Sequence, residues 1–460
     1  MQSLEEIQSV HAMSKMKATT LYEHWPSFAM CYYWFYSQVD ETSTVPSLSI
    51  PLLCLYTMYM KYVIIGNGVA GTTAAFNIRK FDAEGEIIVI TEEDIPFYSR
   101  IRLTEYLSRS VEEKNLILHN DAWYERNKIF LITSRRVVSI NREDSQVCLE
   151  GGTHISYDKL LIATGGKASV PALRDAQKKG IFTLRTIADA RKMRAYSENE
   201  LNVIILGGGV LGLEIGNAFR KTGKSVTIVE YFPRLLPKQM DEPGSGILKD
   251  KLESLGFRFI FNANAEEVLG DETVEGLRLQ DGRSVRGEML VICAGSIPDT
   301  SLLDSTGIKL ARGVPVNKRM ETVLPDIYAA GDATVYGSKN YGIWPAAEKQ
   351  GEVAGINMAG GNASYNGTIP SHSITVAGID VIAFGEVDVD STRPSLVYKD
   401  KEHGIYKKIV ISDDCAVGCI LCGDPSGKRE VIEAVKEKRP LNALRKTLEK
   451  LNIIWTQSQG

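Results

Sequence analysis

The sequence predicts an α/β protein with two Rossmann-like dinucleotide-binding domains and a small C-terminal α+β domain. Three observations support this class. An apolar run that turns into a helix through glycines starts near residue 61, the same unit recurs near residue 201, and the last part of the chain alternates in hydrophobicity before an amphipathic helix. The 460 residues, 44% hydrophobic and 24% charged, suffice for several such domains.

The first glycine unit carries the spacing G-x-G-x-x-G. Residues 62–65 form the apolar run, and the glycines are Gly66, Gly68 and Gly71. The first permits a tight turn, the second lets the backbone approach a pyrophosphate, and the third lets helix and strand pack closely. The next predicted strand ends at Glu92 and Glu93, where a carboxylate can accept the hydroxyls of an adenosine ribose, and we take Glu92 as the candidate.

The second unit repeats the first with Gly207, Gly209 and Gly212. Its following strand ends at Glu230, which would repel the 2′-phosphate of NADP and therefore favours NAD. Arg234 lies close enough in sequence to leave NADPH open. Two such units in one chain predict two bound dinucleotides.

The order of these motifs resembles the FAD-dependent pyridine nucleotide oxidoreductases of the glutathione-reductase type, over nearly all of residues 60–460. Four further stretches carry the resemblance: YDKLLIATGG, VICAGSIPD, ETVLPDIYAAGDAT and WPAAEKQGEVAGINMAG. The positions that the resemblance places at the cofactors are Ala163, Thr164, Gly165, Gly331, Asp332 and Ala347 for FAD and Gly295 for NAD.

The resemblance also implies the domain order. The FAD domain would be discontinuous, residues 60–172 and 298–367, with the NAD domain, 173–297, inserted between its halves. Residues 368–460 would form the C-terminal α+β domain, which in this family commonly supports an interface, so that a homodimer is possible.

The segment 1–59 differs from the rest. It is rich in aromatic residues without a sustained helical or strand period, its apolar runs are too short for a membrane span, and no secretory signal pattern is present. We expect it to be an N-terminal extension added by upstream start-site choice, with Met60 as the natural start. The alternative is a peripheral or partner-binding tail.

The number and positions of the cysteines limit which reactions the sequence predicts. The seven are odd in number and unevenly placed, which favours a reducing cytoplasm. No cysteine lies between Met60 and Val147, where the disulfide reductases of this fold keep theirs, so thiol–disulfide chemistry is not expected. Near the end, Cys415, Cys419 and Cys422 have an iron–sulfur-like spacing, but on a strand Cys415 and Cys419 would share one face and Cys422 the other. We therefore expect no metal.

The segment PFYSRIRL, residues 96–103, resembles the NADH-rubredoxin oxidoreductases and the flavin module of the NADH-dependent nitrite reductase large subunit. This resemblance implies that Arg100 lies against the FAD diphosphate, a suitable use of a planar cation. The alternative is an ordinary surface ion pair.

Two carboxylates are the candidate catalytic residues. By the same resemblance Glu214 lies close to the nicotinamide, and Glu105 stands where many ferredoxin-reductase relatives carry a lysine that pairs with that glutamate. If the two carboxylates are close, one should stay protonated near neutral pH. The nitrite-reductase branch shows the same Leu-[Ser/Thr]-Glu pattern.

Together these features predict a soluble FAD-dependent NADH oxidoreductase that passes electrons through flavin to a small carrier of the rubredoxin or ferredoxin type. A net charge of −4 gives no basic field for nucleic acid. The sirohaem and cluster-binding halves of nitrite reductase are not expected here, so the chain alone should not reduce nitrite. Alternatives are an NADH oxidase, a separate flavin subunit of a nitrite-reductase-like system, and a non-catalytic NADH-responsive flavin sensor.

Overall fold

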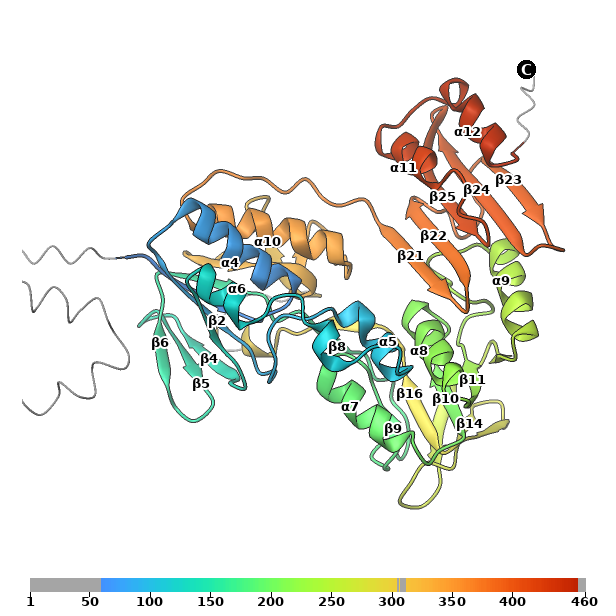
Figure 1. Ribbon diagram of the computed structural model, residues 1–460, viewed down its shortest axis with the longest axis horizontal. Coiled ribbons are helices and arrows are strands. Elements are labelled where there is room, and N and C mark those ends of the chain that lie inside the picture. Colours follow the sequence, from blue (N-terminus) through green and yellow to red (C-terminus); the bar gives the residue numbers. More distant parts are fainter. Residues whose placement is uncertain (1–58, 304–305, 307–311, 454–460) are drawn as a thin grey trace, which may run out of the picture. The chain divides into compact units, whose positions relative to one another are not determined.

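The computed structural model describes residues 59–303, 306 and 312–453 (Figure 1). The expected N-terminal extension lies, up to residue 58, outside this part of the chain. No helix of the described residues has the length and apolar character needed to cross a membrane.

The first parallel sheet draws strands from two separated parts of the chain. Its order is β19-β7-β1-β2-β3, and every neighbouring pair is parallel. The strands are β1 (Lys61–Ile65), β2 (Glu86–Ile90), β3 (Ile129–Ile132), β7 (Lys159–Ile162) and β19 (Ile327–Ala329). The central ones are runs of Ile, Leu and Val with almost no exposure, as expected for parallel strands covered on both faces.

Helices α4 (Val69–Phe81) and α10 (Trp344–Met358) lie side by side against this sheet (Figure 1). Two glycines of α10 make the close packing possible. A Cβ atom at Gly351 would lie 2.3 Å from the carbonyl oxygen of Ala70, and one at Gly355 would lie 2.4 Å from that of Ala74. Helix α10 follows β19 in the chain, and its contact with α4 therefore packs residues 327–358 against the first glycine unit.

The second parallel sheet has the order β12-β11-β10-β16-β9. Its strands are β9 (Ile181–Phe182), β10 (Asn202–Leu206), β11 (Ser225–Val229), β12 (Arg258–Ile260) and β16 (Met289–Ile292). The helices around it are α7 (Ile187–Tyr196), α8 (Val210–Lys221) and α9 (Glu242–Ser254). Both predicted Rossmann-like units are therefore present.

Shorter elements complete the two sheets. Strands β8 (Gly166–Ala168) and β17 (Ser296–Pro298) pair antiparallel where the chain enters and leaves the second sheet. The remaining strands are β4 (Val137–Asn141), β5 (Gln146–Leu149), β6 (His154–Ser156), β13 (Ala265–Leu269), β14 (Gly276–Leu279), β15 (Ser284–Arg286), β18 (Val314–Val316) and β20 (Thr334–Tyr336). Two short helices, α5 (Leu103–Leu107) and α6 (Asp121–Arg126), lie in the long connection between β2 and β3.

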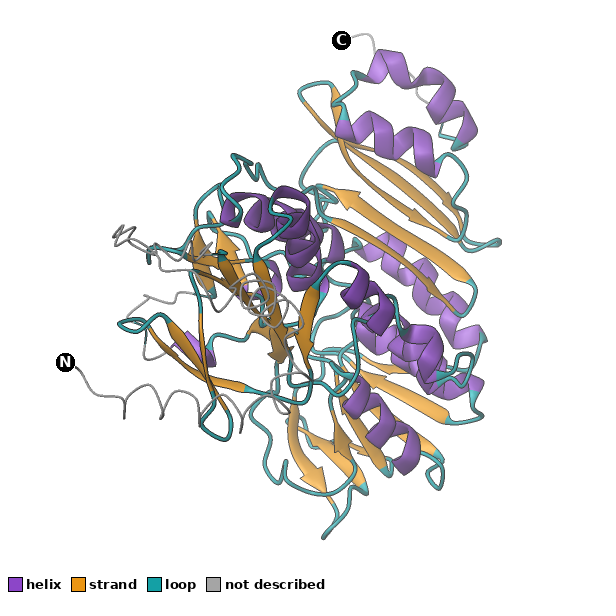
Figure 2. Cartoon of the chain, turned by 60° about the vertical axis from the view of Figure 1, so that its left-hand side comes forward, coloured by secondary structure: helices purple, strands orange, loops and turns teal. Residues whose placement is uncertain are grey.

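The C-terminal part is an antiparallel sheet with the order β21-β22-β25-β24-β23. Its strands are β21 (Ser371–Val376), β22 (Ile379–Gly385), β23 (Ser395–Asp400), β24 (Ile405–Ser412) and β25 (Cys415–Cys422). Helices α11 (Lys428–Lys436) and α12 (Arg445–Lys450) lie on one face of these strands (Figure 2). The predicted fold class, two Rossmann-like units plus a C-terminal α+β domain, is confirmed.

One hydrophobic core joins parts that are distant in sequence. It combines Leu213 and Ile228 of the second parallel sheet and its helices with Val376 and Ile420 of the C-terminal sheet, and it also includes Leu107 of α5. The opposite face of the C-terminal sheet has its own core under α11 and α12. The C-terminal sheet is thus packed onto the second Rossmann-like unit through shared apolar surface.

A buried polar cluster reinforces this junction. The Lys408 ammonium lies 3.0 Å from the Asp241 carboxylate and 3.5 Å from that of Asp388, and all three side chains are 5% exposed or less. Asp241 also accepts a hydrogen bond of 2.5 Å from the Tyr406 hydroxyl and one of 3.1 Å from the backbone N–H of Gly244, at the start of α9. Each buried charge therefore has a partner, as burial requires.

Candidate functional site

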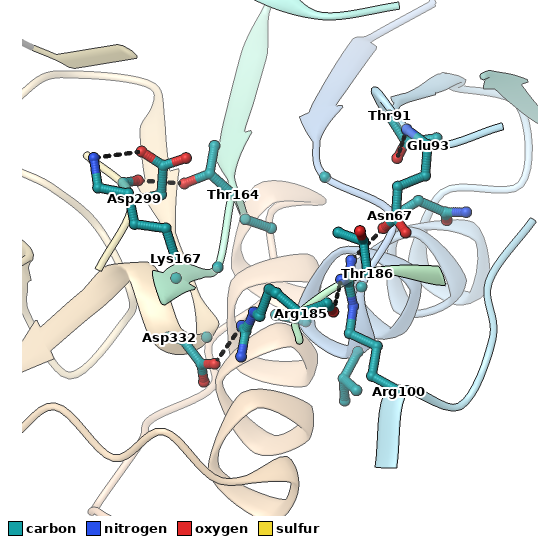
Figure 3. A pocket seen from close by; sticks show the side chains of 18 of the residues that line it. Asn67, Thr91, Glu93, Arg100, Thr164, Lys167, Arg185, Thr186, Asp299 and Asp332 are labelled. Carbon is teal, nitrogen blue, oxygen red and sulfur yellow. Dashed lines mark hydrogen bonds and ion pairs between the residues drawn. The ribbon is translucent and has the colours of Figure 1, made fainter. Parts of the chain in front are cut away.

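A cavity of about 480 Å³ opens where β1, β2 and β7 end. Its lining comes from the first glycine loop, the start of α10, residues of the segment 183–186 and strand β8. Figure 3 shows polar side chains converging on this space from several elements. The predicted FAD residues that line it are Gly66, Gly68, Glu92, Arg100, Ala163, Thr164, Gly165, Gly331, Asp332 and Ala347.

The three glycines of the first unit have distinct roles. Gly66 has a φ of +108°, and a Cβ atom there would lie 2.2 Å from the carbonyl oxygen of Ala163. A Cβ atom at Gly71 would lie 2.0 Å from the carbonyl oxygen of Gly66, so this glycine packs helix against strand and does not line the cavity. At Gly68, the N-cap of α4, a Cβ atom would point into open space. The free helix N-terminus and this open approach fit an anionic diphosphate.

The second unit repeats this geometry. Gly207 has a φ of +120° and packs against the carbonyl oxygen of Cys293, Gly212 packs against that of Gly207, and Gly209 faces open space as the N-cap of α8. Gly295 also has a positive φ and open space around it. None of these residues lines the cavity described above, so the predicted NAD set forms a separate region.

The Glu230 side chain is buried and not freely exposed for binding a ribose. Its side chain is 5% exposed, and its carboxylate accepts hydrogen bonds from the backbone N–H groups of Gly208, at 2.5 Å, and Phe232, at 2.8 Å. Arg234 points toward the C-terminal domain, where its guanidinium donates to the carbonyl oxygen of Val389 at 3.4 Å. Neither arrangement tests coenzyme choice, which stays a prediction.

The cavity wall contains both acidic and basic side chains. Glu92 is exposed and lies 3.8 Å from the guanidinium of Arg136. Arg100 pairs closely with Glu93 and donates a 2.8 Å hydrogen bond to the carbonyl oxygen of Arg185. Arg100 therefore has both features that the sequence left as alternatives, since it makes an ion pair and lines the cavity.

Sequence reasoning missed several residues of the cavity. Arg185 donates a 2.8 Å hydrogen bond to the Asp332 carboxylate across the space, and Lys167 lies 3.9 Å from Asp299 (Figure 3). Asn67, inside the glycine motif, accepts hydrogen bonds from the hydroxyls of Thr72 and Tyr124. Its amide nitrogen is a buried donor without a partner in the described part of the chain. Asn67 had a sequence signal, its place between two motif glycines, and so did Asp299, the last residue of the stretch VICAGSIPD.

The two candidate catalytic carboxylates come from helices that pack together, α5 and α8. Glu214 is partly buried and makes no hydrogen bond or ion pair within the described residues, whereas Glu105 is paired with Arg102, 2.8 Å away. Burial and the negative charge of Glu105 raise the pKa of Glu214 to about 7. The catalytic roles remain predictions.

The cysteines of β25 require one correction. Val410 of β24 pairs with Gly418 and Ile411 pairs with Ala416, so Val417 is an extra residue that forms a bulge in β25. Ala416 therefore lies in the same core as Cys419, and Cys415 does not share that face, contrary to the expectation that Cys415 and Cys419 lie on one side. Cys422 lies in the opposite core. Burial raises the pKa of Cys419 and Cys422 to about 12, and no cluster of three ligating side chains occurs among the described residues.

Two glycine units of matching geometry, the first bordering a cavity, are typical of dinucleotide-binding folds. Sequence comparison identifies the family of this protein. The chain belongs to the pyridine nucleotide-disulphide oxidoreductase family, whose model matches residues 60–351. Residues 370–439 match the rubredoxin NAD+ reductase C-terminal domain. The protein is therefore an oxidoreductase of a family of NAD(P)H-dependent flavin reductases.

Individual relatives agree with this family. The chain is 33% identical to the NADH-rubredoxin oxidoreductase of Clostridium acetobutylicum over 382 residues, which are 82% of this chain and 95% of that protein. It is 31% identical to a nitrite reductase of Bacillus subtilis over 86% of this chain, but it spans only 49% of that longer protein. The solved structure of the Clostridium acetobutylicum NADH:rubredoxin oxidoreductase matches with a TM-score of 0.70 at 29% identity, covering 86% of this chain and 99% of that one.

Proposed function

We propose that this protein is an FAD-dependent NADH oxidoreductase that transfers electrons from NADH, through flavin, to a small redox carrier of the rubredoxin or ferredoxin type. The observation that supports it best is the cavity, because residues from both separated parts of the predicted FAD domain, Gly66 and Asp332 among them, line one continuous space. The relative that matches over nearly its full length is an NADH-rubredoxin oxidoreductase.

The residues present fit FAD. Gly68 leaves the N-terminus of α4 open for the diphosphate, and the guanidinium groups of Arg100 and Arg185, each paired with a carboxylate, lie in the same wall. Glu92 is free to accept ribose hydroxyls, since its one ion-pair partner among the described residues, Arg136, lies 3.8 Å away. FAD held by these residues would supply the redox chemistry of hydride acceptance and electron transfer.

The protein's own part in the reaction is mainly positional. The open N-terminus of α8 at Gly209 would hold the NADH diphosphate, and hydride transfer then depends on proximity and orientation more than on a general base. We propose that no cysteine takes part. Of the cysteines in the described ranges, none lines the cavity, and burial raises the pKa of Cys293, the one beside the second glycine loop, to about 12.

The test is anaerobic rapid mixing of the flavin-loaded protein with NADH and separately with NADPH, while flavin absorbance is followed. Fast bleaching by NADH, with rapid recovery only after rubredoxin or ferredoxin is added, is the expected result. Bleaching that no carrier reverses would instead favour the sensor, and rapid recovery with oxygen alone would favour an NADH oxidase.

A second candidate, a separate flavin subunit of a nitrite-reductase-like system, is supported by the match to about half of the Bacillus subtilis nitrite reductase. In that case neither rubredoxin nor ferredoxin should discharge the reduced flavin quickly. A protein carrying the cluster-binding half of a nitrite reductase should do so.

A further inference from the structure

Glu214 is the one feature of the second glycine unit that the proposed function leaves unexplained. A carboxylate in partly buried surroundings normally has a hydrogen-bond donor or a cation beside it. Glu214 has neither within the described residues, although Glu105, on the neighbouring helix, has Arg102.

Its place in α8 links it to the coenzyme. Glu214 is the fifth residue of the helix that begins after Gly209, so it lies roughly 6 to 8 Å along the helix from the N-terminus at which a diphosphate would bind. An ionised carboxylate at that range repels a dianion, and a neutral carboxyl group does not.

The elements packed against α8 offer little opposite charge. Helix α5 contributes Glu105 and the buried Tyr106, strands β10 and β11 carry no titratable side chain, and strand β21 contributes His372. Burial lowers the pKa of His372, so that it is largely neutral near pH 7. Glu105 is thus the charged neighbour that acts on Glu214.

We propose that binding of the coenzyme to α8 is coupled to proton uptake by Glu214, and that the burial of Glu214, together with the neighbouring Glu105, keeps Glu214 available for it. This inference rests on the proposed function, since it assumes that a dinucleotide diphosphate binds at the second glycine loop. No bond is formed or broken. One proton moves from solvent to the Glu214 carboxylate as the dianion arrives.

The pH dependence follows from the pKa of about 7 that burial and Glu105 give to Glu214. Binding of an anion raises this pKa further, so the complex holds more protons than the free protein around neutral pH. Affinity should therefore be highest below pH 7 and fall as the pH rises, by about three- to tenfold in all if the shift is roughly half to one pKa unit. At pH 7.5 the uptake would be about 0.3 to 0.5 proton per chain.

The experiment is isothermal calorimetry of the flavin-loaded protein with ADP-ribose. This probe carries the diphosphate and ribose but no nicotinamide, so neither redox chemistry nor the nicotinamide charge interferes. Titration in two buffers of different ionisation enthalpy gives the number of protons taken up, and a series from pH 6 to 9 gives the dissociation constant.

Three variants and one control make the test specific. Glu214→Gln, which mimics the protonated group, should abolish uptake and bind equally well at all pH values, and Glu214→Asp should restore the dependence. Glu105→Gln should move the uptake maximum to lower pH, since it removes the neighbouring negative charge. Glu125→Gln, an exposed position on α6, should behave as the wild type.

The outcomes separate the two proposals. Absence of ADP-ribose binding to a folded, flavin-loaded protein would contradict the proposed function. Tight binding with equal proton uptake in the wild type and in Glu214→Gln, or with none in either, would overturn the inference alone. If Glu214→Gln does not fold, an unshifted pH profile in Glu105→Gln is enough to reject it.

Discussion

The buried lysine at the junction of the C-terminal sheet and the second Rossmann-like unit offers a quantitative test of what holds the two together. Lys408→Met keeps a long apolar stem but removes the ammonium group. The carboxylates of Asp241 and Asp388, 3.0 and 3.5 Å away, are then left without their buried cation. Breaking one partner of a buried ion pair typically costs about 3 to 5 kcal/mol, because an uncompensated charge stays behind.

If the second Rossmann-like unit and the C-terminal sheet unfold together, they form a cooperative unit of roughly 150 to 250 residues, in which each kcal/mol lowers the melting temperature by about 2 to 4 °C. A loss of about 3 to 5 kcal/mol then corresponds to a fall in melting temperature of roughly 6 to 20 °C. Thermal unfolding followed by circular dichroism, together with urea unfolding at fixed pH, measures it. Lys446→Met, at an exposed site on α12, is the matched control and should change stability by no more than about 0.5 kcal/mol.

A double variant tests whether the unpaired buried charges cause the loss of stability. Asp241→Asn combined with Lys408→Met removes both charges of the closer pair, so it should cost less than the sum of the two single changes. If Lys408→Met costs less than about 1 kcal/mol, or if the effects simply add, the reasoning from the buried charges is refuted.

Three further outcomes are expected. Gly71→Ala should lower the FAD content of the purified protein, because the added Cβ would lie 2.0 Å from the carbonyl oxygen of Gly66. Gly223→Ala is the control and should retain flavin, since the added Cβ meets open space, although the positive φ at this position costs some stability. Arg185→Ala should release flavin about tenfold more readily, measured by the recovery of free flavin fluorescence, if the guanidinium supports the bound diphosphate. Asp424→Asn should flatten the stability of the protein between about pH 2 and 4 in urea titrations. Although burial opposes it, hydrogen bonds from Lys407 and Ser426 lower the pKa of Asp424 from 3.8 to about 2, so the unfolded chain binds more protons and stability is lost as the pH falls through this window.

The parts of the site that could be predicted from the sequence are those set by local backbone demands. Gly71 is required by its contact with Gly66 inside one strand-turn-helix unit, and Gly66 by the positive φ of the turn, and such local demands leave a fixed spacing in the sequence. Ala347 and Asp332 could be placed because the family resemblance covers their whole stretches.

Arg185 could not be predicted in this way. It reaches Asp332 across 147 positions of the sequence, and a contact over such a separation leaves no local spacing that a sequence motif could show. The prediction that Cys415 and Cys419 lie on the same side of strand β25 was wrong. A single bulge in the strand moves every residue before it to the opposite side, and the sequence does not show where a bulge will form. The environment of Glu214 was anticipated because α5 and α8 are both marked by sequence motifs.

The core that the second parallel sheet shares with the C-terminal sheet constrains how the chain folds during synthesis. Residues around Leu213 and Ile228 leave the ribosome well before Val376 and Ile420, which complete the same apolar cluster. Domains synthesised first usually fold as soon as they emerge. Here the second Rossmann-like unit keeps part of its apolar surface uncovered until the C-terminal sheet has been made. The two sheets should then gain protection from amide hydrogen exchange together, as one cooperative unit.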